Sequence, residues 1–346
     1  MRRNLSYLLS LCPAIVTIWG NFHGGWWTLG NLLFSFGLLG IAEIILPSNT
    51  KNEHTKSGDA FPEFVVYLHV IAHTLVWMSL FYGIYHGILR DKFIFFAALS
   101  SGAEAGSGGI IVAHELVHKA SSIKQFFGKY LLATSGNIYF FVHHLRIHHR
   151  YVGTHKDAAT ARENETLYHF VMRTMRGQTK EAWESESVRL RKINLPTFHF
   201  KNIILQNVLL QLVFVGICGF FFSWTGIAVW LIYIAMGNIL LEYVNYIEHY
   251  GLVRDENVRV NETHSWNSDK VVSRFFLVEL SRHSDHHHFA SKPYHTLESN
   301  ANSPMLPGGY ASMVLPALIP PLWRAIVHPK LAEHKRSNTA KGFSPG

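Results

Sequence analysis

The segment NIILQNVLLQLVFVGICGFFFSWTGIAVWLIYIAMGNILL (residues 202–241) decides the fold, because it contains no Asp, Glu, Lys or Arg in 40 consecutive positions. A transmembrane helix needs about 20 mostly apolar residues. The segment therefore has room for two such helices. FFSWTGI (221–227), in its middle, predicts the turn and carries a tryptophan of the kind found at membrane interfaces. We interpret residues 202–241 as a pair of membrane-spanning helices.

Three further uncharged windows, residues 4–42, 64–89 and 93–103, extend this pattern through the N-terminal third of the chain. The first has room for two helices joined by NFHGGWWTLG (21–30), and the others predict one helix each, the last continuing past Glu104. The sequence thus predicts an all-α integral membrane protein with about six transmembrane helices. A cleaved signal peptide would account for only one short apolar region. A buried soluble core would rarely contain such long uncharged stretches.

Lysine and arginine placement predicts the orientation of these helices. MRRN (1–4), KNEHTK (51–56) and the long polar regions 119–201 and 250–346 hold most of the basic residues. By the positive-inside rule these segments and both termini face the cytoplasm, and only Arg90 and Lys92 fall outside. The net charge of +8 then reflects this rule, or also an acidic protein partner that docks on the cytoplasmic face.

The chain is expected to form one membrane domain over residues 1–346. Its expected parts are the first four spans (1–113), a polar insertion (114–201), the last two spans (202–248) and a polar C-terminal part (249–346). Within the insertion, residues 126–142 predict an apolar interfacial helix and residues 155–193 an amphipathic helix. The two cysteines, Cys12 and Cys218, lie in apolar segments, which argues against a disulfide framework or a cysteine metal site.

Histidines gather in four short motifs beside the predicted spans. These are HELVH (114–118), HHLRIHH (143–149), NYIEHYG (245–251) and RHSDHH (282–287). Spacings of three and four bring side chains onto one face of a helix, so each motif is expected to present its imidazoles to one point. In the predicted topology all four motifs lie at the cytoplasmic boundary of the membrane.

Imidazole suits iron, zinc, copper and nickel as a neutral ligand. Nine imidazoles exceed the four ligands of a tetrahedral zinc ion and suit two metal ions with four or five ligands each. Carboxylates near the motifs are candidates to accept the second ring N–H of a ligand and to balance the metal charge: Glu115, Asp157, Glu248 and Asp285.

Three other interpretations compete with a dimetal site. Histidines could simply satisfy hydrogen bonds in a polar layer. HELVH also matches the zinc-protease signature HExxH, but a protease would leave six of the imidazoles unexplained. A histidine-lined metal transporter would instead place its ligands near the middle of the bilayer.

The motifs HELVHK, HHLRIHH, NYIEHYGL and LSRHSDHH, in this order, resemble those of the bacterial membrane alkane monooxygenases, within the membrane di-iron desaturases and hydroxylases. Further segments follow the same family pattern: HSWNSDKVVSRFFLVELSRHSDHH (264–287), PYHTL (293–297), LPGGYASM (306–313) and LIPPLWR (318–324). The resemblance covers most of the chain from His114 to Pro329.

This resemblance implies a membrane di-iron monooxygenase that uses O2 to hydroxylate the terminal methyl group of medium- or long-chain n-alkanes to 1-alkanols. It implies two non-haem iron ions held by nine histidines: His114, His118, His144, His148, His149, His249, His283, His286 and His287. Electrons would come from rubredoxin, with rubredoxin reductase and NAD(P)H upstream. The expected location is the bacterial inner membrane, in contact with lipid and with no nucleic-acid partner. The alternative is a related hydroxylase or desaturase acting on aryl methyl groups or fatty acyl chains.

The second motif departs from the family pattern, which usually has Glu and Gly where this chain has His143 and Ile147. His143 is expected either to replace the glutamate as a hydrogen-bond partner or to compete as a ligand. Outside the motifs, His69 and His73 predict hydrogen bonding between helices or a lining role in a substrate cavity, and Glu104 is expected to be paired or protonated. Arg282 is expected in the polar layer or at a docking surface.

Overall fold

The computed structural model describes residues 2–53 and 58–340, and this part of the chain is helical, with no β-strand. Part of the basic segment KNEHTK therefore lies outside the described residues. The described chain forms two compact units. Unit 1 comprises Met1–Leu38, Gly58–Phe141 and Trp183–Leu241, and unit 2 comprises Leu39–Ser57, Val142–Ala182 and Glu242–Gly346. The all-α prediction is confirmed, and the single membrane domain over 1–346 stays a prediction.

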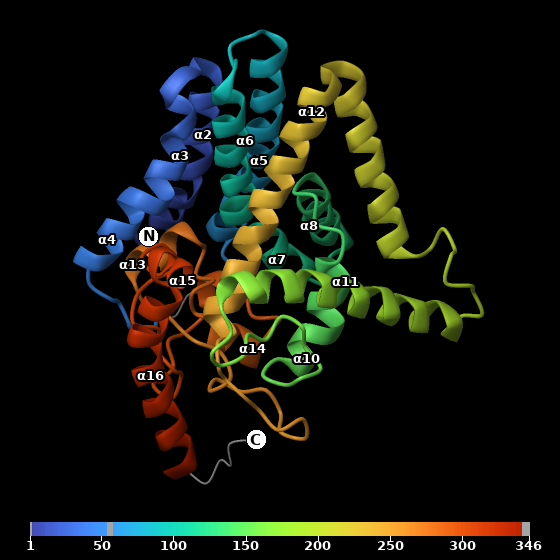
Figure 1. Cartoon of the computed structure of the whole chain (residues 1–346). Coiled ribbons are helices and arrows are strands. Elements are labelled where there is room, and N and C mark those ends of the chain that lie inside the picture. The colour runs from blue at the N-terminus through green and yellow to red at the C-terminus, as the bar shows by residue number, and fades with distance from the viewer. Residues whose placement is uncertain (1, 54–57, 341–346) are drawn as a thin grey trace. The chain divides into compact units, whose positions relative to one another are not determined.

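Unit 1 is a bundle of long apolar helices, and α2, α5 and α6 lie side by side in it (Figure 1). Its helical elements are α1 (Arg2–Ser6), η1 (Tyr7–Leu11), α2 (Cys12–His23), η2 (Gly25–Leu29), α3 (Gly30–Leu32), η3 (Leu33–Leu38), α5 (Ala60–Tyr85), α6 (Lys92–Glu104), η4 (Ala105–Ile110), α7 (Ile111–Val117), α8 (Ser122–Thr134) and most of α12 (Ile203–His249). Asp59 caps α5 by accepting a hydrogen bond from the backbone N–H of Phe61 at 3.1 Å. Leu80, Ala97, Trp230 and Tyr233 form the centre of the apolar core of this unit.

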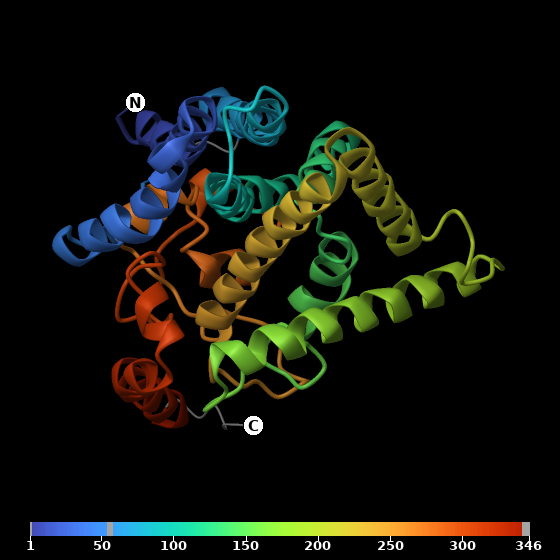
Figure 2. The same ribbon diagram turned by 45° about the horizontal axis from the view of Figure 1, so that its top comes forward.

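Five helices of the described chain are long and apolar enough to cross a membrane: Arg3–His23, Gly25–Ile45, Ala60–Tyr85, Lys92–Val117 and Ile203–His249. The last has 47 residues, or about 70 Å at 1.5 Å per residue, more than twice the thickness of the hydrocarbon core. Its backbone leaves the helical region at Ser223, inside the predicted turn, and Figure 2 shows its two halves meeting at a sharp bend. Counted as two, these halves give the predicted six spans.

The tip of this bend exposes large apolar side chains. Phe220 and Trp224 are both 83% exposed. Only 11% of the most apolar window of α12 is buried inside the protein, although this helix is the most apolar of the five. Contiguous exposed apolar surface of this kind marks contact with a partner or a membrane. Lipid contact therefore explains why the least buried helix is also the most apolar.

Unit 2 consists of shorter helices joined by structured loops. Its elements are α4 (Leu39–Ile45), α9 (Phe140–His143, begun in unit 1), η5 (His144–His148), α10 (His149–Tyr151), the first part of α11 (Leu167–Lys192), the end of α12, α13 (Val271–Phe276), α14 (His283–His288), η6 (Tyr294–Thr296), α15 (Val314–Leu318) and α16 (Pro320–Ala340). Buried ion pairs hold its loops, including Arg274 with Glu279 at 2.7 Å and Arg282 with Asp269 at 3.2 Å.

Two helix predictions need correction. The single helix expected over 126–142 is two helices, α8 and α9, because Gly136 adopts a positive φ of 69° that ends the first one. The amphipathic helix expected over 155–193 begins only at Leu167. The preceding residues form a loop in which Asp157 contacts His148 of η5 and Thr160 donates a hydrogen bond to Asp157.

Candidate metal centre

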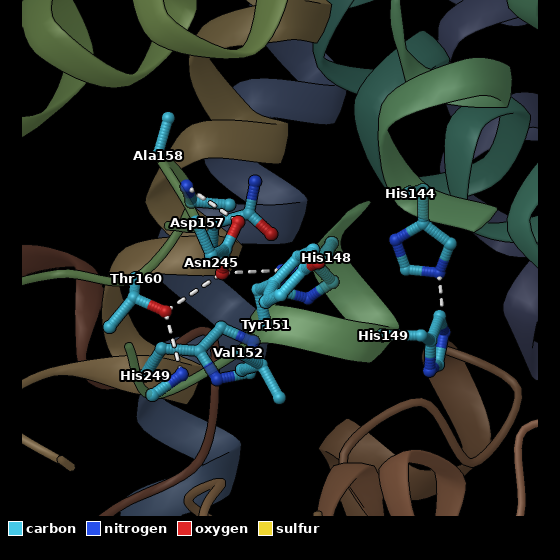
Figure 3. Close-up of polar contacts among 12 residues, drawn as sticks. His144, His148, His149, Tyr151, Val152, Asp157, Ala158, Thr160, Asn245 and His249 are labelled. Atoms are coloured by element: carbon cyan, nitrogen blue, oxygen red, sulfur yellow. Dashed lines mark hydrogen bonds and ion pairs between the residues drawn. The ribbon is translucent and has the colours of Figure 1, made fainter. Parts of the chain in front are cut away.

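A π-helical turn organises the histidines of the second motif. In an α-helix, residues four apart share a face. The wider π-helical turn bonds residues five apart, and such turns occur frequently at functional sites. Accordingly His144 Nε2 lies 2.9 Å from His149 Nε2, five residues on, as Figure 3 shows. His148 is left on a different side of the turn.

The last motif forms the short helix α14. His283 and His287 are four residues apart, and their Nε2 atoms lie 2.9 Å from each other. His286 lies on another side of α14, and its Nε2 atom is 3.2 Å from His149 Nε2. At the end of α12, His249 places its Nε2 atom 3.3 Å from His283 Nε2.

Unit 2 therefore contains two neighbouring groups of imidazoles. Group A consists of His144, His149 and His286, and group B of His148, His249, His283 and His287. Within each group, the potential ligand atoms lie within 4.8 Å of one another. The expectation that each motif faces one point is wrong for the second and fourth motifs, because each contributes to both groups.

The two remaining predicted ligands belong to unit 1. His114 lies in the last turn of α7 and His118 directly follows that helix. Their ring centroids are 5.0 Å apart. The i, i+4 spacing of the first motif thus brings its two imidazoles together, as expected for ordinary α-helical geometry.

The geometry of the two groups fits metal binding. Imidazole nitrogens lie about 2.0–2.1 Å from a bound zinc ion, so neighbouring ligand atoms are separated by roughly 3 Å. The Nε2 atoms of His283, His287 and His249 face one another at 2.9 and 3.3 Å, so their lone pairs converge when the ring protons lie on Nδ1. His148 Nε2 is buried and makes no hydrogen bond to the described residues.

Burial and the surrounding imidazoles set the protonation state of group B. Burial, followed by the proximity of His283 and the other imidazoles, lowers the pKa of His287 well below its usual value. The ring is therefore neutral at physiological pH. A neutral imidazole is the form that binds a metal ion.

Asp157 contacts the ring nitrogen of His148 that does not face the other imidazoles of group B. Its carboxylate lies 2.9 Å from His148 Nδ1 and also accepts the hydroxyl of Thr160 at 2.7 Å (Figure 3). Burial acts to raise the pKa of Asp157, but the neighbouring His148 and His143 and the hydrogen bonds outweigh it, so the pKa lies below its usual value. The carboxylate stays ionised, fixes the proton of His148 on Nδ1 and leaves Nε2 available to a metal.

Glu248 approaches the site differently from the expected pattern. Its Oε2 atom lies 3.1 Å from His283 Nε2, the nitrogen that faces the rest of group B. The expected contact was with the other ring nitrogen, Nδ1. Its Oε1 atom accepts the hydroxyl of Tyr310 at 2.6 Å. The carboxyl group of Glu248 is thus directed toward the interior of group B.

The other two candidate carboxylates have lysine partners. Glu115 pairs with Lys119 at 2.6 Å in unit 1. Asp285 pairs with Lys292 at 2.7 Å and accepts the backbone N–H of Glu298 at 2.8 Å. The described contacts of Asp285 therefore hold the loop after α14.

His143 forms a third small cluster. Its Nε2 atom lies 2.9 Å from Glu181 Oε2 and 3.6 Å from Asp157 Oδ1. These contacts favour the hydrogen-bonding role over the competing ligand role. The sequence did not predict the roles of Glu181 and Tyr310. Glu181 lies 38 residues away on α11, where the amphipathic pattern marks the buried face but assigns no partner to a charge on it.

Arg282 was expected in the polar layer or at a docking surface, and the structure excludes the docking surface. The side chain is fully buried, so it is not part of a docking surface. It donates to the backbone carbonyl of Leu297 at 2.7 Å and pairs with Asp269. Because it directly precedes α14, these contacts fix the entry to the helix that carries His283, His286 and His287.

Comparisons with known proteins agree with this geometry. Residues 92–317 match the family model described as fatty acid desaturase. The chain is 44% identical to alkane 1-monooxygenase 1 of Pseudomonas aeruginosa over 67% of the chain and 62% of that protein. It is 35% identical to alkane 1-monooxygenase 2 of the same organism over 88% of the chain and 87% of that protein.

A less similar relative is named for different substrates. The chain is 28% identical to the xylene/toluene monooxygenase hydroxylase component XylM of Pseudomonas putida, over 94% of the chain. The first relative extends beyond the matched region, since the match covers less than two thirds of its length. The family match and the full-length similarity agree on one assignment: the chain belongs to the fatty acid desaturase family, among its alkane 1-monooxygenase members.

Proposed function

We propose that this chain is a membrane di-iron monooxygenase that hydroxylates the terminal methyl group of n-alkanes. The observation that carries the proposal is the pair of neighbouring imidazole groups in unit 2, in a chain whose relatives are named alkane 1-monooxygenases. The overall reaction consumes one alkane, one O2, two electrons and two protons, and it yields one 1-alkanol and one water. The iron pair, when bound, supplies the activation of O2 and the oxidation of the C–H bond.

The nine motif histidines are the proposed ligands. Seven of them form groups A and B, and His114 and His118 supply the other two. Two irons with four or five imidazoles each account for all nine. The all-imidazole donor set supports iron but also suits other first-row metals, so the family membership carries the choice of iron.

The protein's own residues prepare the site. Asp157 orients His148, and Tyr310 holds Glu248 against His283. Burial of six of the seven unit 2 ligands keeps bulk water out, which strengthens the interaction of these ligands with bound cations. An alkane offers no polar group, so its recognition rests on apolar contacts and on exclusion of water.

An acidic electron donor fits a basic cleft in unit 2. The cleft has a volume of about 670 Å³, and the metal-ligand candidates His149 and His287 line it together with Arg150, Arg254 and Arg259. Arg254 is buried and donates to the backbone carbonyls of Val152 and Arg150, so it stabilises the backbone that lines the cleft. Arg150 and Arg259 are exposed and attract an acidic protein electrostatically. We propose rubredoxin as that donor, with rubredoxin reductase and NAD(P)H upstream.

The proposed location is the bacterial inner membrane, with the histidine motifs on the cytoplasmic side. Helices long and apolar enough to span a membrane support the membrane assignment. The distribution of lysine and arginine supports the orientation.

A reconstituted assay tests the function. Purified iron-loaded protein, rubredoxin, its reductase and NADH are supplied with octane, hexadecane, xylene or a fatty acid, and the products are identified by mass spectrometry. We expect a 1-alkanol from an alkane, with NADH and O2 consumed in equal amounts. The similarity to XylM makes aryl methyl hydroxylation the second candidate, which would appear as methylbenzyl alcohol from xylene with no 1-alkanol. Absence of any hydroxylated product would contradict the proposed chemistry.

A further inference from the structure

Unit 1 contains a buried polar cluster that the metal centre does not use. His69 and His73 lie on α5, and Glu104 ends α6. All three side chains are at most 2% exposed, within helices that are apolar enough to span a membrane. Ionisable groups in such helices are costly and commonly mark functional positions.

His73 has polar contacts on both sides of its ring. The His73 Nδ1 atom lies 3.2 Å from Glu104 Oε2. On the other side of the ring, Nε2 lies 3.0 Å from the hydroxyl oxygen of Thr134, and the Tyr233 hydroxyl approaches it at 3.4 Å. Because Thr134 donates its own proton to the carbonyl of Tyr130, it accepts the proton of His73 Nε2. A single further proton must then lie between His73 Nδ1 and the carboxylate.

His69 has a partner on one side only. Its Nε2 atom lies 2.7 Å from the hydroxyl oxygen of Ser10. Its Nδ1 atom and Glu104 Oε1 are buried and make no hydrogen bond to the described residues. A buried polar atom without a partner destabilises the fold, so both positions favour a partner that the described residues do not supply.

Both of these atoms face the same glycine. His69 Nδ1 and Glu104 Oε1 lie within 4 Å of the point that a Cβ atom on Gly108 would occupy. Gly108 belongs to the π-helical turn η4 and contributes no side chain beside these two atoms. One water molecule donates two hydrogen bonds and accepts two, so it satisfies both atoms for either tautomer of His69.

We propose that His69, Glu104 and His73 bind one buried water molecule and hold one exchangeable proton, as a chain running His69–water–Glu104–His73 within unit 1. Each link in the chain either donates or accepts a proton. The chain therefore holds one proton between α5 and α6 within the apolar bundle. This role is independent of the proposed oxidation chemistry.

Infrared spectroscopy of the full-length, iron-loaded protein tests the shared proton. We expect a carboxyl band that shifts in D2O and disappears in Glu104→Gln. Glu63→Gln is the matched control, since Glu63 is a partly exposed carboxylate of α5 paired with Lys124 at 2.9 Å, and it should leave the band unchanged. Persistence of the same band in Glu104→Gln would overturn the assignment.

Gly108→Ala tests the water. The added methyl group would lie against Glu104 Oε1 and displace the water, so the carboxyl band should shift. Gly216→Ala is the control, because a Cβ atom there meets no neighbour within 4 Å. If both variants give the wild-type band, the water position is wrong.

A measurement on the wild-type protein keeps the proposal falsifiable if a variant does not fold. In uniformly ¹³C,¹⁵N-labelled wild-type protein, magnetisation transfer from water should reach His69 Nδ1, which is assigned through its through-bond connection to the His69 backbone. We expect a water cross-peak at this nitrogen and a proton on both ring nitrogens of His73, or one proton shared with Glu104. No water cross-peak at His69 would overturn the proposal.

Discussion

Units 1 and 2 both bury imidazoles, but the atoms around the rings differ. In unit 1, both nitrogens of His73 face oxygen atoms, those of Thr134 and Glu104. In unit 2, the Nε2 atoms of His283, His287 and His249 face one another. Oxygen partners can donate or accept protons, whereas converging imidazole nitrogens whose protons lie on Nδ1 offer their lone pairs to a cation. The surrounding atoms, rather than the i, i+4 spacing of the histidines, therefore separate a proton-sharing cluster from a metal site.

Removing one converging nitrogen should have the largest effect. His287→Ala takes away a group B nitrogen that lies 2.9 Å from His283 Nε2. We expect loss of at least one iron per chain and a fall in hydroxylation greater than the roughly 10–100-fold that loss of an outer partner costs. Metal analysis and the alkane assay measure the two effects.

His288→Ala is the matched control for this variant. His288 is the next residue of α14 but pairs with Glu262 at 3.2 Å and belongs to neither group. Its substitution should leave the iron content unchanged. Equal iron in His287→Ala and the wild type would remove His287 from the proposed ligands.

Substituting the supporting carboxylate should have an intermediate effect. Asp157→Asn removes the charge that fixes the proton of His148 on Nδ1. Iron affinity or activity is expected to fall roughly 10–100-fold, as for other outer partners of metal ligands. Titration of the metal-free protein with ferrous iron under anaerobic conditions measures the affinity.

Asp255→Asn serves as the control for charge alone, because Asp255 is an exposed carboxylate of the same unit. It should bind iron like the wild type. An unchanged affinity in Asp157→Asn would show that the proton of His148 needs no anionic partner.

Much of the architecture could be predicted from where charges are missing. The 40 uncharged residues 202–241 predict a helical pair and a turn at 221–227, and the backbone breaks at Ser223. It could also be predicted which histidines lie close together, because their motifs are short and rich in histidine. Their partition between groups A and B could not, since it depends on a π-helical turn at His144–His148 that periodicity does not reveal.

The residues that hydrogen-bond to the imidazoles and to Glu248 were only partly predictable, for a different physical reason. Asp157 lies nine residues from His148, within the same insertion, and was identified as a candidate. Glu181 and Tyr310 reach the site from distant segments, 38 residues from His143 and 62 from Glu248. Contacts of this kind are set by tertiary packing. A local pattern of charges or apolar residues carries no information about them.

The smallest expected effect on iron is that of a substitution in unit 1. His73→Gln breaks the contact with Glu104 and leaves buried oxygen atoms short of a partner, so the protein should lose about 1–3 kcal/mol of stability. Its iron content should equal that of the wild type, because His73 faces oxygen atoms only. His86→Gln, at the exposed end of the same helix α5, is the control for stability. Thermal unfolding and metal analysis of the three proteins decide the point. Loss of iron in His73→Gln alone would show that the His73 cluster and the metal site are coupled. The atoms around an imidazole would then not be enough to distinguish a proton-sharing cluster from a metal site.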